Sequence, residues 1–138
     1  MSKRDFFHDA VKNALIKDGW TVTHDPYELK VGGVDMAVDL GAERILAAEK
    51  DNQKIAIEIK SFISASEISE FHTALGQFIN YKIALAEKEP ARKLYLAVPK
   101  DVYDTFFQLP LVKKSGRFAK LKLIVYQPIT EEIVKWKN

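Results

Sequence analysis

The hydrophobic positions of the chain follow a helical period in some stretches and a strand period in others. From Asp5 to Asp18 apolar residues recur every three or four positions, which predicts an amphipathic helix that Gly19 ends. A second helix is expected to begin near Ser64–Ser66, where Ser64 and Glu67 resemble a capping box, and to end before Pro90. Its predicted apolar stripe consists of Ile68, Phe71, Leu75, Phe78, Ile79 and Leu85.

Shorter apolar runs predict the strands of a sheet. Val34–Leu40 alternates apolar and polar residues, and Ile45–Ala48 with Ile55–Lys60 predicts a hairpin around Asp51-Asn52. The stretch Asp101–Lys114 is expected to be helical with a break at Pro110. Four further strands are expected at Trp20–Thr23, Leu94–Val98, Leu121–Tyr126 and Ile133–Trp136, the last at an edge.

This order of helices and strands predicts an α/β protein whose sheet carries helices on both faces. The chain has 138 residues and shows no internal repeat or low-complexity linker, so we expect a single domain over residues 1–138. No apolar run is long enough to cross a bilayer, and the first residues do not resemble a signal peptide. The absence of cysteine excludes a disulfide framework and a thiolate metal site. We therefore expect a cytoplasmic protein without a membrane partner.

The strand Ile55–Lys60 combines an apolar face with a charged one. Because side chains alternate along a strand, Ile55, Ile57 and Ile59 point to one side, and Glu58 and Lys60 to the other. Charged side chains are seldom fully buried unless they pair or bind a metal ion, so this Glu-x-Lys indicates a site. The alternative is a half-exposed strand whose ion pair contributes roughly 0–1 kcal/mol.

A neighbouring strand carries more carboxylates. In Val34–Leu40, Asp35 and Asp39 lie on the face opposite to the apolar residues. Mg²⁺ or Mn²⁺ binds carboxylate oxygens, so one Asp together with Glu58 could hold such an ion. The ion would lower the pKa of a bound water and stabilise charge on a phosphate under attack, with Lys60 beside that charge. A solvated polar strand face is the alternative.

Positive charge is concentrated in the second half of the chain. Residues 70–138 contain twelve Lys and Arg against seven Asp and Glu, whereas residues 1–69 contain nine against twelve. Lys113, Lys114, Arg117, Lys120 and Lys122 lie between residues 111 and 124, with no acid among them. Such a patch could bind the phosphates of DNA. A merely solvated basic surface is the alternative.

The acids and the lysine resemble the PD-(D/E)XK nuclease superfamily, in which an acid on one strand joins a Glu-x-Lys on the next. The resemblance implies a restriction-endonuclease-like three-layer fold with a mixed central β-sheet flanked by helices. It assigns Asp39 as the first acid, Glu58 as the second and Lys60 as the lysine, with Asp39 and Glu58 as metal ligands. Gln77, followed by Tyr81, matches the Gln and Tyr of a later helix, and His8 occupies the position of a first-helix Glu.

Nearly the whole chain resembles the XisH family, the fdxN-element excision controlling factors of cyanobacteria. The resemblance is carried by residues 7–20, 39–43, 57–62 and 71–78. It implies a role in the programmed, site-specific excision of a DNA element by a recombinase during cell differentiation, alongside a companion factor of the XisI family. DNA cleavage with Mg²⁺ or Mn²⁺ is one expectation. A regulatory partner without catalysis, which binds the companion factor or the recombinase, is the other, and a homodimer is compatible with both.

The sequence leaves the first acid of the motif open. Asp35, Glu43 and Glu49 compete with Asp39, and no proline precedes Asp39 as the superfamily pattern would have it. Counting back from a turn at Asp51-Asn52 places Glu58 opposite Ile45 rather than opposite an acid. His8 in place of Glu would also alter the metal ligands, because imidazole suits softer metals than magnesium.

Overall fold

The structure is a computed structural model, and it describes residues 2–45 and 52–138. Its described strands form a six-stranded sheet in the order β1-β4-β5-β6-β7-β8 and a separate two-stranded sheet of β2 and β3. The strands are β1 (Thr21–His24), β2 (Tyr27–Val31), β3 (Val34–Val38), β4 (Leu40–Ile45), β5 (Asn52–Ile59), β6 (Arg92–Pro99), β7 (Leu123–Gln127) and β8 (Glu132–Lys137). The helices are α1 (Lys3–Lys17), α2 (Glu67–Lys88), α3 (Lys100–Asp104), the 3₁₀ turn η1 (Phe106–Gln108) and α4 (Pro110–Phe118).

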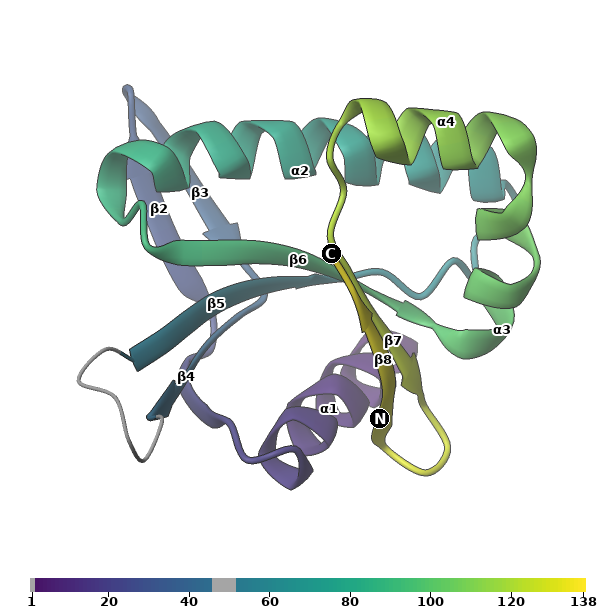
Figure 1. The fold of residues 1–138 in the computed structure, drawn as a ribbon, viewed down its shortest axis with the longest axis horizontal. Helices are drawn as coiled ribbons and strands as arrows, with labels where there is room; N and C mark the ends of the chain where they lie inside the picture. Colours follow the sequence, from purple (N-terminus) through teal and green to yellow (C-terminus); the bar gives the residue numbers. More distant parts are fainter. Residues whose placement is uncertain (1, 46–51) are drawn as a thin grey trace.

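The large sheet is mixed and lies between helices (Figure 1). Strands β5, β6 and β7 are parallel to one another, while β1, β4 and β8 join antiparallel at the two sides. Helices α2 and α4 cover one face, and α1 covers the other (Figure 1). The predicted three-layer α/β architecture with a mixed central sheet is therefore confirmed. Among the described helices, none has the length and apolarity that crossing a bilayer requires.

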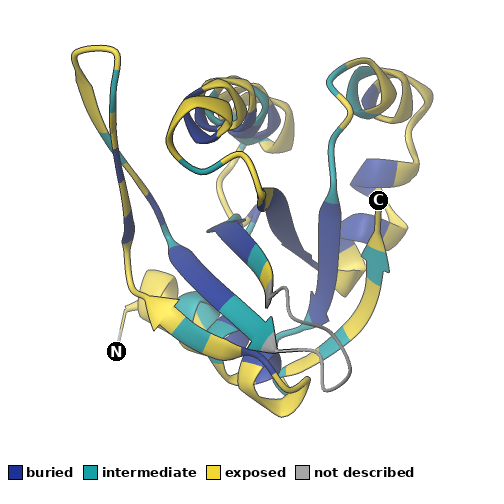
Figure 2. Ribbon diagram, turned by 60° about the vertical axis from the view of Figure 1, so that its left-hand side comes forward, coloured by how far each residue is buried: buried dark blue, intermediate teal, exposed yellow. Residues whose placement is uncertain are grey.

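Each face of the sheet buries its own hydrophobic core. Ile55 and Ile57 of β5 pack on the side of α1, whereas Ala56 packs on the side of α2. The predicted alternation along this strand is thus confirmed. Figure 2 shows the central strands dark blue, while the edge strands and the β2–β3 hairpin are largely exposed. Strand β5 therefore brings its next α2-side residue, Glu58, into a mostly apolar layer.

The two predicted long helices form, with corrections to the second. The N-cap of α2 is Ser66, whose hydroxyl accepts from the Ser69 N–H at 3.3 Å. The predicted start near Ser64–Ser66 is therefore confirmed, whereas the capping box at Ser64 is wrong. Phe71, Phe78 and Leu85 are buried as predicted. Ile68 and Ile79 are instead exposed, because α2 turns the following residues toward the sheet: Phe71, Ala74, Phe78, Tyr81, Ala84 and Leu85.

The predicted strand Val34–Leu40 is divided by the structure at Asp39. Its first part is β3, which forms a hairpin with β2, a strand that the sequence pattern did not predict. Its last residue, Leu40, begins β4 of the large sheet. The break occurs where the Asp39 carboxylate accepts the Ile59 N–H of β5 at 2.8 Å. The predicted strand Ile45–Ala48 and its turn fall mainly outside the described residues.

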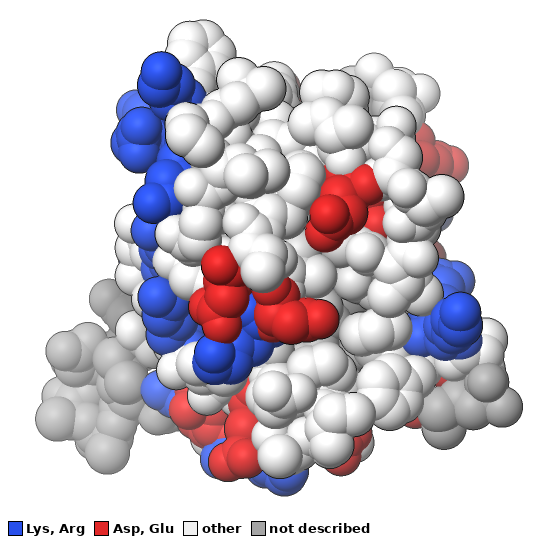
Figure 3. Space-filling view, turned by 90° about the vertical axis from the view of Figure 1, so that its right-hand side faces the viewer, with Lys and Arg blue, Asp and Glu red and all other residues white. Residues whose placement is uncertain are grey.

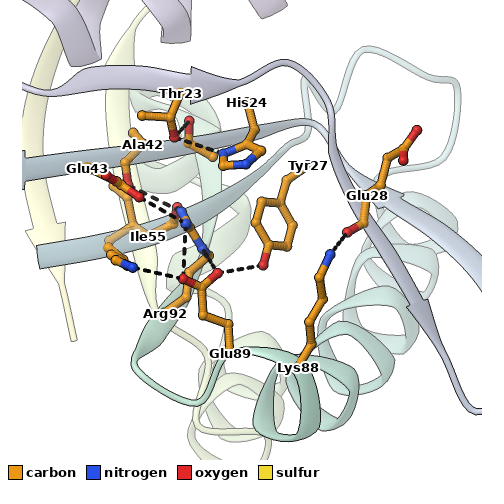
Figure 4. Close-up of polar contacts among 12 residues, drawn as sticks. Thr23, His24, Tyr27, Glu28, Ala42, Glu43, Ile55, Lys88, Glu89 and Arg92 are labelled. Carbon is orange, nitrogen blue, oxygen red and sulfur yellow. Dashed lines mark hydrogen bonds and ion pairs between the residues drawn. The ribbon is translucent and has the colours of Figure 1, made fainter.

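A buried arginine joins the hairpin, α2 and the large sheet (Figure 4). Arg92, at the start of β6, donates to Glu89 Oε1 and to the Ile55 carbonyl, both at 2.8 Å. Glu89 also accepts from the Tyr27 hydroxyl at 2.6 Å and from Lys54 at 3.2 Å. Hydrogen bonding from Arg92, opposed by burial and reinforced by Tyr27 and Lys54, lowers the pKa of Glu89 to about 2. This cluster is structural, and it holds β2 against the end of α2.

Candidate functional site

Asp39 and Glu58 meet where β4 begins and β5 ends. Leu40 lies opposite Ile57 in the antiparallel ladder, so Asp39 and Glu58 occupy the next opposing positions. Glu58 Oε1 accepts the Asp39 N–H at 3.3 Å, and Asp39 Oδ2 accepts the Ile59 N–H at 2.8 Å. Each carboxylate is thereby fixed by the backbone of the other strand.

The position of Glu58 opposite Ile45, obtained by counting from a turn at residues 51 and 52, is wrong. Ile45 lies opposite Asn52, because the β5 ladder already begins where that turn was expected. Moving the turn shifts the register until an acid, and not an isoleucine, faces Glu58.

The competing acids lie elsewhere. Asp35 is an exposed residue of β3, opposite Lys30 of β2 in the small sheet. Glu43 lies on β4 and its carboxylate is 3.4 Å from Arg92. Glu49 lies outside the described residues. Of the described alternatives, the structure therefore brings Asp39 to Glu58.

Lys60 extends the same face by one step beyond β5. Its backbone N–H donates to the Ala97 carbonyl of β6 at 3.0 Å, so the ladder continues and Lys60 follows the alternation of Glu58. The Lys60 Nζ lies 3.6 Å from Glu58 Oε2. The side chains of Lys60 and Glu58 are only 16% and 9% exposed, so this pair is not an ordinary surface ion pair.

The electrostatics of Glu58 differ from those of a solvated carboxylate. Burial, and then the negative charge of Asp39, raise the pKa of Glu58 from 4.5 to about 7, although Lys60 counteracts this in part. Glu58 therefore exchanges its proton near neutral pH. A divalent cation at the two carboxylates would supply the missing positive charge and displace that proton.

Helix α2 contributes a phenol near the acids, at Tyr81, and a buried amide oxygen one turn before it, at Gln77. The Gln77 side-chain oxygen is buried and has no hydrogen-bond partner among the described residues. Tyr81 lies one turn further along the same helix face. Burial, followed by the charges of Glu58 and Asp39, raises its pKa to about 12. The superfamily resemblance matched the segment from Gln77 to Tyr81 to a Gln followed by a Tyr on a later helix, but only Gln77 was selected as a site residue.

Helix α1 closes the other side of Asp39. Asp39, Arg4, His8 and Ser61 are among the residues that line a pocket of about 150 Å³. The exposed Arg4 guanidinium lies 3.8 Å from Asp39 Oδ1. Arg4 was missed from the sequence, because a basic residue at the start of a helix carries no distinctive pattern.

His8 lies at this pocket, but its ring is already bonded. Its Nε2 lies 2.8 Å from Asp25 Oδ1, and Lys12 donates to the other oxygen of Asp25 at 2.9 Å. Burial alone would raise the pKa of Asp25, yet Lys12 and His8 together outweigh burial and lower it. The structure therefore places His8 near Asp39 as part of a separate ion-pair group.

The predicted basic residues divide between two hollows. Lys113 and Arg117, one helical turn apart on α4, line a large cavity together with Lys120. Lys114 lines a neighbouring hollow that includes Phe118. Figure 3 shows Lys and Arg side chains gathered along one margin of the molecule, with acidic groups nearer the centre of that view.

The donors at Asp39 and Glu58 suit a hard cation with a partly aqueous shell. Within residues 2–45 and 52–138, no three His, Cys, Asp or Glu side chains gather closely enough to hold a metal ion between them. Mg²⁺ commonly takes one or two carboxylates and fills its other positions with water and substrate. The unpartnered Gln77 oxygen is a further polar group that a water could satisfy.

The fold and these residues define a three-layer α/β protein with a partly buried carboxylate pair and a lysine at the end of a central strand. The chain belongs to the XisH family: the family's sequence model, described as XisH protein, matches residues 1–134.

Two solved structures agree closely with this one. An XisH family protein from Nostoc punctiforme PCC 73102 is 49% identical, with a TM-score of 0.90 over 97% of this chain and 100% of its own. An fdxN element excision controlling factor protein from Anabaena variabilis is 51% identical, with a TM-score of 0.89 over 98% of this chain and 100% of its own. No curated protein matches the chain at a significant level.

Proposed function

We propose that this protein is a controlling factor for the excision of a DNA element and that it cleaves DNA at a metal-dependent site. The name of the Anabaena variabilis relative supports the first part. One observation carries the second: Asp39 and Glu58 face each other on adjacent strands, with the Lys60 Nζ 3.6 Å from Glu58. The resemblance of these residues to the PD-(D/E)XK superfamily supports the same chemistry.

Each residue of the site has a distinct role in this proposal. Asp39 and Glu58 would supply oxygens for Mg²⁺ or Mn²⁺, which activates water and neutralises phosphate charge when bound. Lys60 would stabilise the negative charge that develops on the scissile phosphate. The Gln77 oxygen, which has no partner among the described residues, would accept a hydrogen bond from the attacking water and so orient it.

The basic residues of α4 and its C-terminal end would hold the DNA backbone. Lys113, Lys114, Arg117 and Lys120 form no ion pair within the described part of the chain. Their charges are therefore free to replace the counterions of DNA phosphates, and binding should weaken steeply as salt rises.

The catalytic claim is tested by incubating the protein with supercoiled and branched DNA in Mg²⁺ or Mn²⁺. We expect cleavage by the wild type and a loss of at least about a hundred-fold in Glu58→Ala, since a metal ligand is removed. Glu87→Ala is the matched control, because Glu87 is an exposed residue of α2. Absence of cutting on every substrate, or equal cutting by Glu58→Ala, would refute the claim.

A second candidate function is that of a regulatory partner without catalysis, which binds a companion factor of the XisI family or the recombinase. The observation that favours it is a group of exposed apolar side chains on α2 and α4. Ile83, Leu111 and Phe118 are 63%, 66% and 92% exposed. Leu75, Ile79 and Phe118 line one hollow between these helices. Clustered apolar exposure of this kind is typical of protein contact surfaces.

A further inference from the structure

A second cavity, separate from the Asp39–Glu58 site, combines an apolar floor with a cationic border. It measures about 790 Å³ and lies between α4, the end of α2 and strands β7 and β8. Its floor is formed by the buried side chains of Tyr103, Phe107, Val112 and Leu123. We call it the basic cavity, after the residues of its border.

Six cationic side chains form that border. They come from α2, from α4 and the segment that follows it, and from β8: Lys82, Lys113, Arg117, Lys120, Lys122 and Lys137. No acidic side chain of the described residues lines the cavity. None of the six has a carboxylate within ion-pair distance in the described part of the chain.

Tyr103 is the point at which the apolar and cationic parts meet. The Lys137 Nζ lies 3.4 Å from its hydroxyl, and the Lys135 Nζ lies 4.4 Å from its ring centre. Burial would raise the pKa of Tyr103, but Lys135 and Lys137 outweigh burial and lower it. Positive charge therefore acts at the floor of the basic cavity as well as at its opening.

We propose that the basic cavity binds an unpaired nucleotide, with the nucleobase against Tyr103 and Phe107 and the phosphates at the lysine and arginine border. Its volume falls within the usual range of small-molecule sites, about 300–1,000 Å³. Aromatic side chains beside a cationic groove are the common means of binding single-stranded nucleic acid. Paired nucleobases are enclosed in the duplex and cannot reach an apolar cavity floor of this kind.

The choice of a nucleotide over another phosphorylated ligand rests on the proposed DNA-directed function. The nucleotide could belong to single-stranded DNA, such as strands opened during excision, or be free in solution. Both present the same chemistry, an aromatic ring joined to phosphate, and binding experiments separate them.

A steric variant distinguishes occupation of the basic cavity from attraction to its charge. Gly116 lines the cavity from α4, and a Cβ added there would lie 3.8 Å from Leu121 Cδ2, an ordinary contact. Gly116→Leu therefore extends a side chain among the lining residues without altering any charge. Arg117→Glu reverses one border charge, and Lys30→Glu makes the same change on the exposed face of the β2–β3 hairpin.

The experiment measures binding of fluorescent dT12, and of a 12-base-pair duplex, by anisotropy in EDTA. We expect dT12 to bind more tightly than the duplex. Arg117→Glu and Gly116→Leu should each weaken dT12 binding about ten-fold or more, as the loss of one phosphate contact or one stacked base implies. Lys30→Glu should change it less than two-fold. Circular dichroism melting confirms that each variant folds.

Competition by dTTP then identifies the source of the nucleotide. Displacement of dT12 by dTTP would show that a free nucleotide enters the basic cavity, and failure to displace would assign it to a strand. Binding by Gly116→Leu equal to that of the wild type would overturn the proposal, as would an equal effect of Lys30→Glu and Arg117→Glu. Because EDTA removes divalent metal, these results stand apart from the cleavage assay with Glu58→Ala.

Discussion

At the scale of single residues, Glu58 illustrates how a functional group can be unfavourable for folding. The residue is buried and its carboxyl lies beside a second carboxylate, so ionisation carries both a desolvation cost and a repulsion. Lys60 offsets these effects only in part. Such an arrangement lowers the stability of the metal-free protein and places two carboxylates where a cation could bind them.

The first prediction concerns the pH dependence of this cost. The folded pKa of Glu58, about 7, exceeds the unfolded value of 4.5, so the folded state binds the proton more tightly. The stabilisation from this protonated carboxyl is fully present below pH 4.5 and is lost as pH rises through 7. Relative to Glu58→Gln, the wild type should therefore lose on the order of 3 kcal/mol of unfolding free energy between pH 4.5 and 8.

Denaturant unfolding of both proteins across this pH range, in EDTA, provides the measurement. Parallel curves for the two proteins would show that Glu58 titrates normally in the folded state. Addition of Mg²⁺ at pH 8 should restore stability to the wild type and not to Glu58→Gln, because only the wild type retains both carboxylates.

Glu89 has the opposite behaviour. Its folded pKa, about 2, lies below the unfolded value, so its stabilising contribution is present above pH 4.5 and is lost as pH falls through 2. Glu89→Gln should lower stability at pH 7 by about 2 kcal/mol and have a much smaller effect near pH 2. Thermal melts at the two pH values test this, and an effect independent of pH would contradict it.

At the scale of secondary-structure elements, β4 depends on a close approach that only glycine permits. A Cβ at Gly41 would lie 3.0 Å from the Tyr27 ring and 3.1 Å from His24, in the contact between β4, β1 and the small hairpin. Gly41→Ala should therefore destabilise the protein by about 1–3 kcal/mol, as overpacking does.

Gly76 is the matched control within α2. A Cβ there meets nothing within 4 Å, so Gly76→Ala should stabilise the protein by about 0.5–1 kcal/mol through helix propensity alone. Urea unfolding of the two variants measures both effects. A neutral Gly41→Ala would show that β1 and the hairpin move away from β4 without cost.

At the scale of the whole molecule, the described surface offers an acidic site, a basic cavity and an apolar area on α2 and α4. The regulatory candidate function predicts that Phe118→Asp abolishes co-purification with a companion factor of the XisI family, because Phe118 is 92% exposed. Val34→Asp, at an exposed apolar residue of β3, is the control. Retention of the complex by Phe118→Asp would remove this surface from the interaction.

The sequence predicted most elements because local pattern decides them. The spacing of Phe7, Val11 and Leu15 defined α1, and the alternation along β5 assigned Glu58 to the face opposite its isoleucines. Asp39 was selected through a family resemblance, since Asp35 fits the same alternation equally well. The β2–β3 hairpin was missed because the continuous alternation through Val38 and Leu40 conceals a change from one sheet to another.

By itself, the sequence determined the α/β class, the two long helices and the charged face of the central strand, because helical and strand periods are properties of neighbouring residues. Only the tertiary structure decided that Asp39, and not Asp35 or Glu43, faces Glu58. It also decided that Tyr81 lies beside both acids and that distant lysines border one cavity. Register and the packing of α2 and α4 set these juxtapositions, and both depend on contacts between residues far apart in the chain.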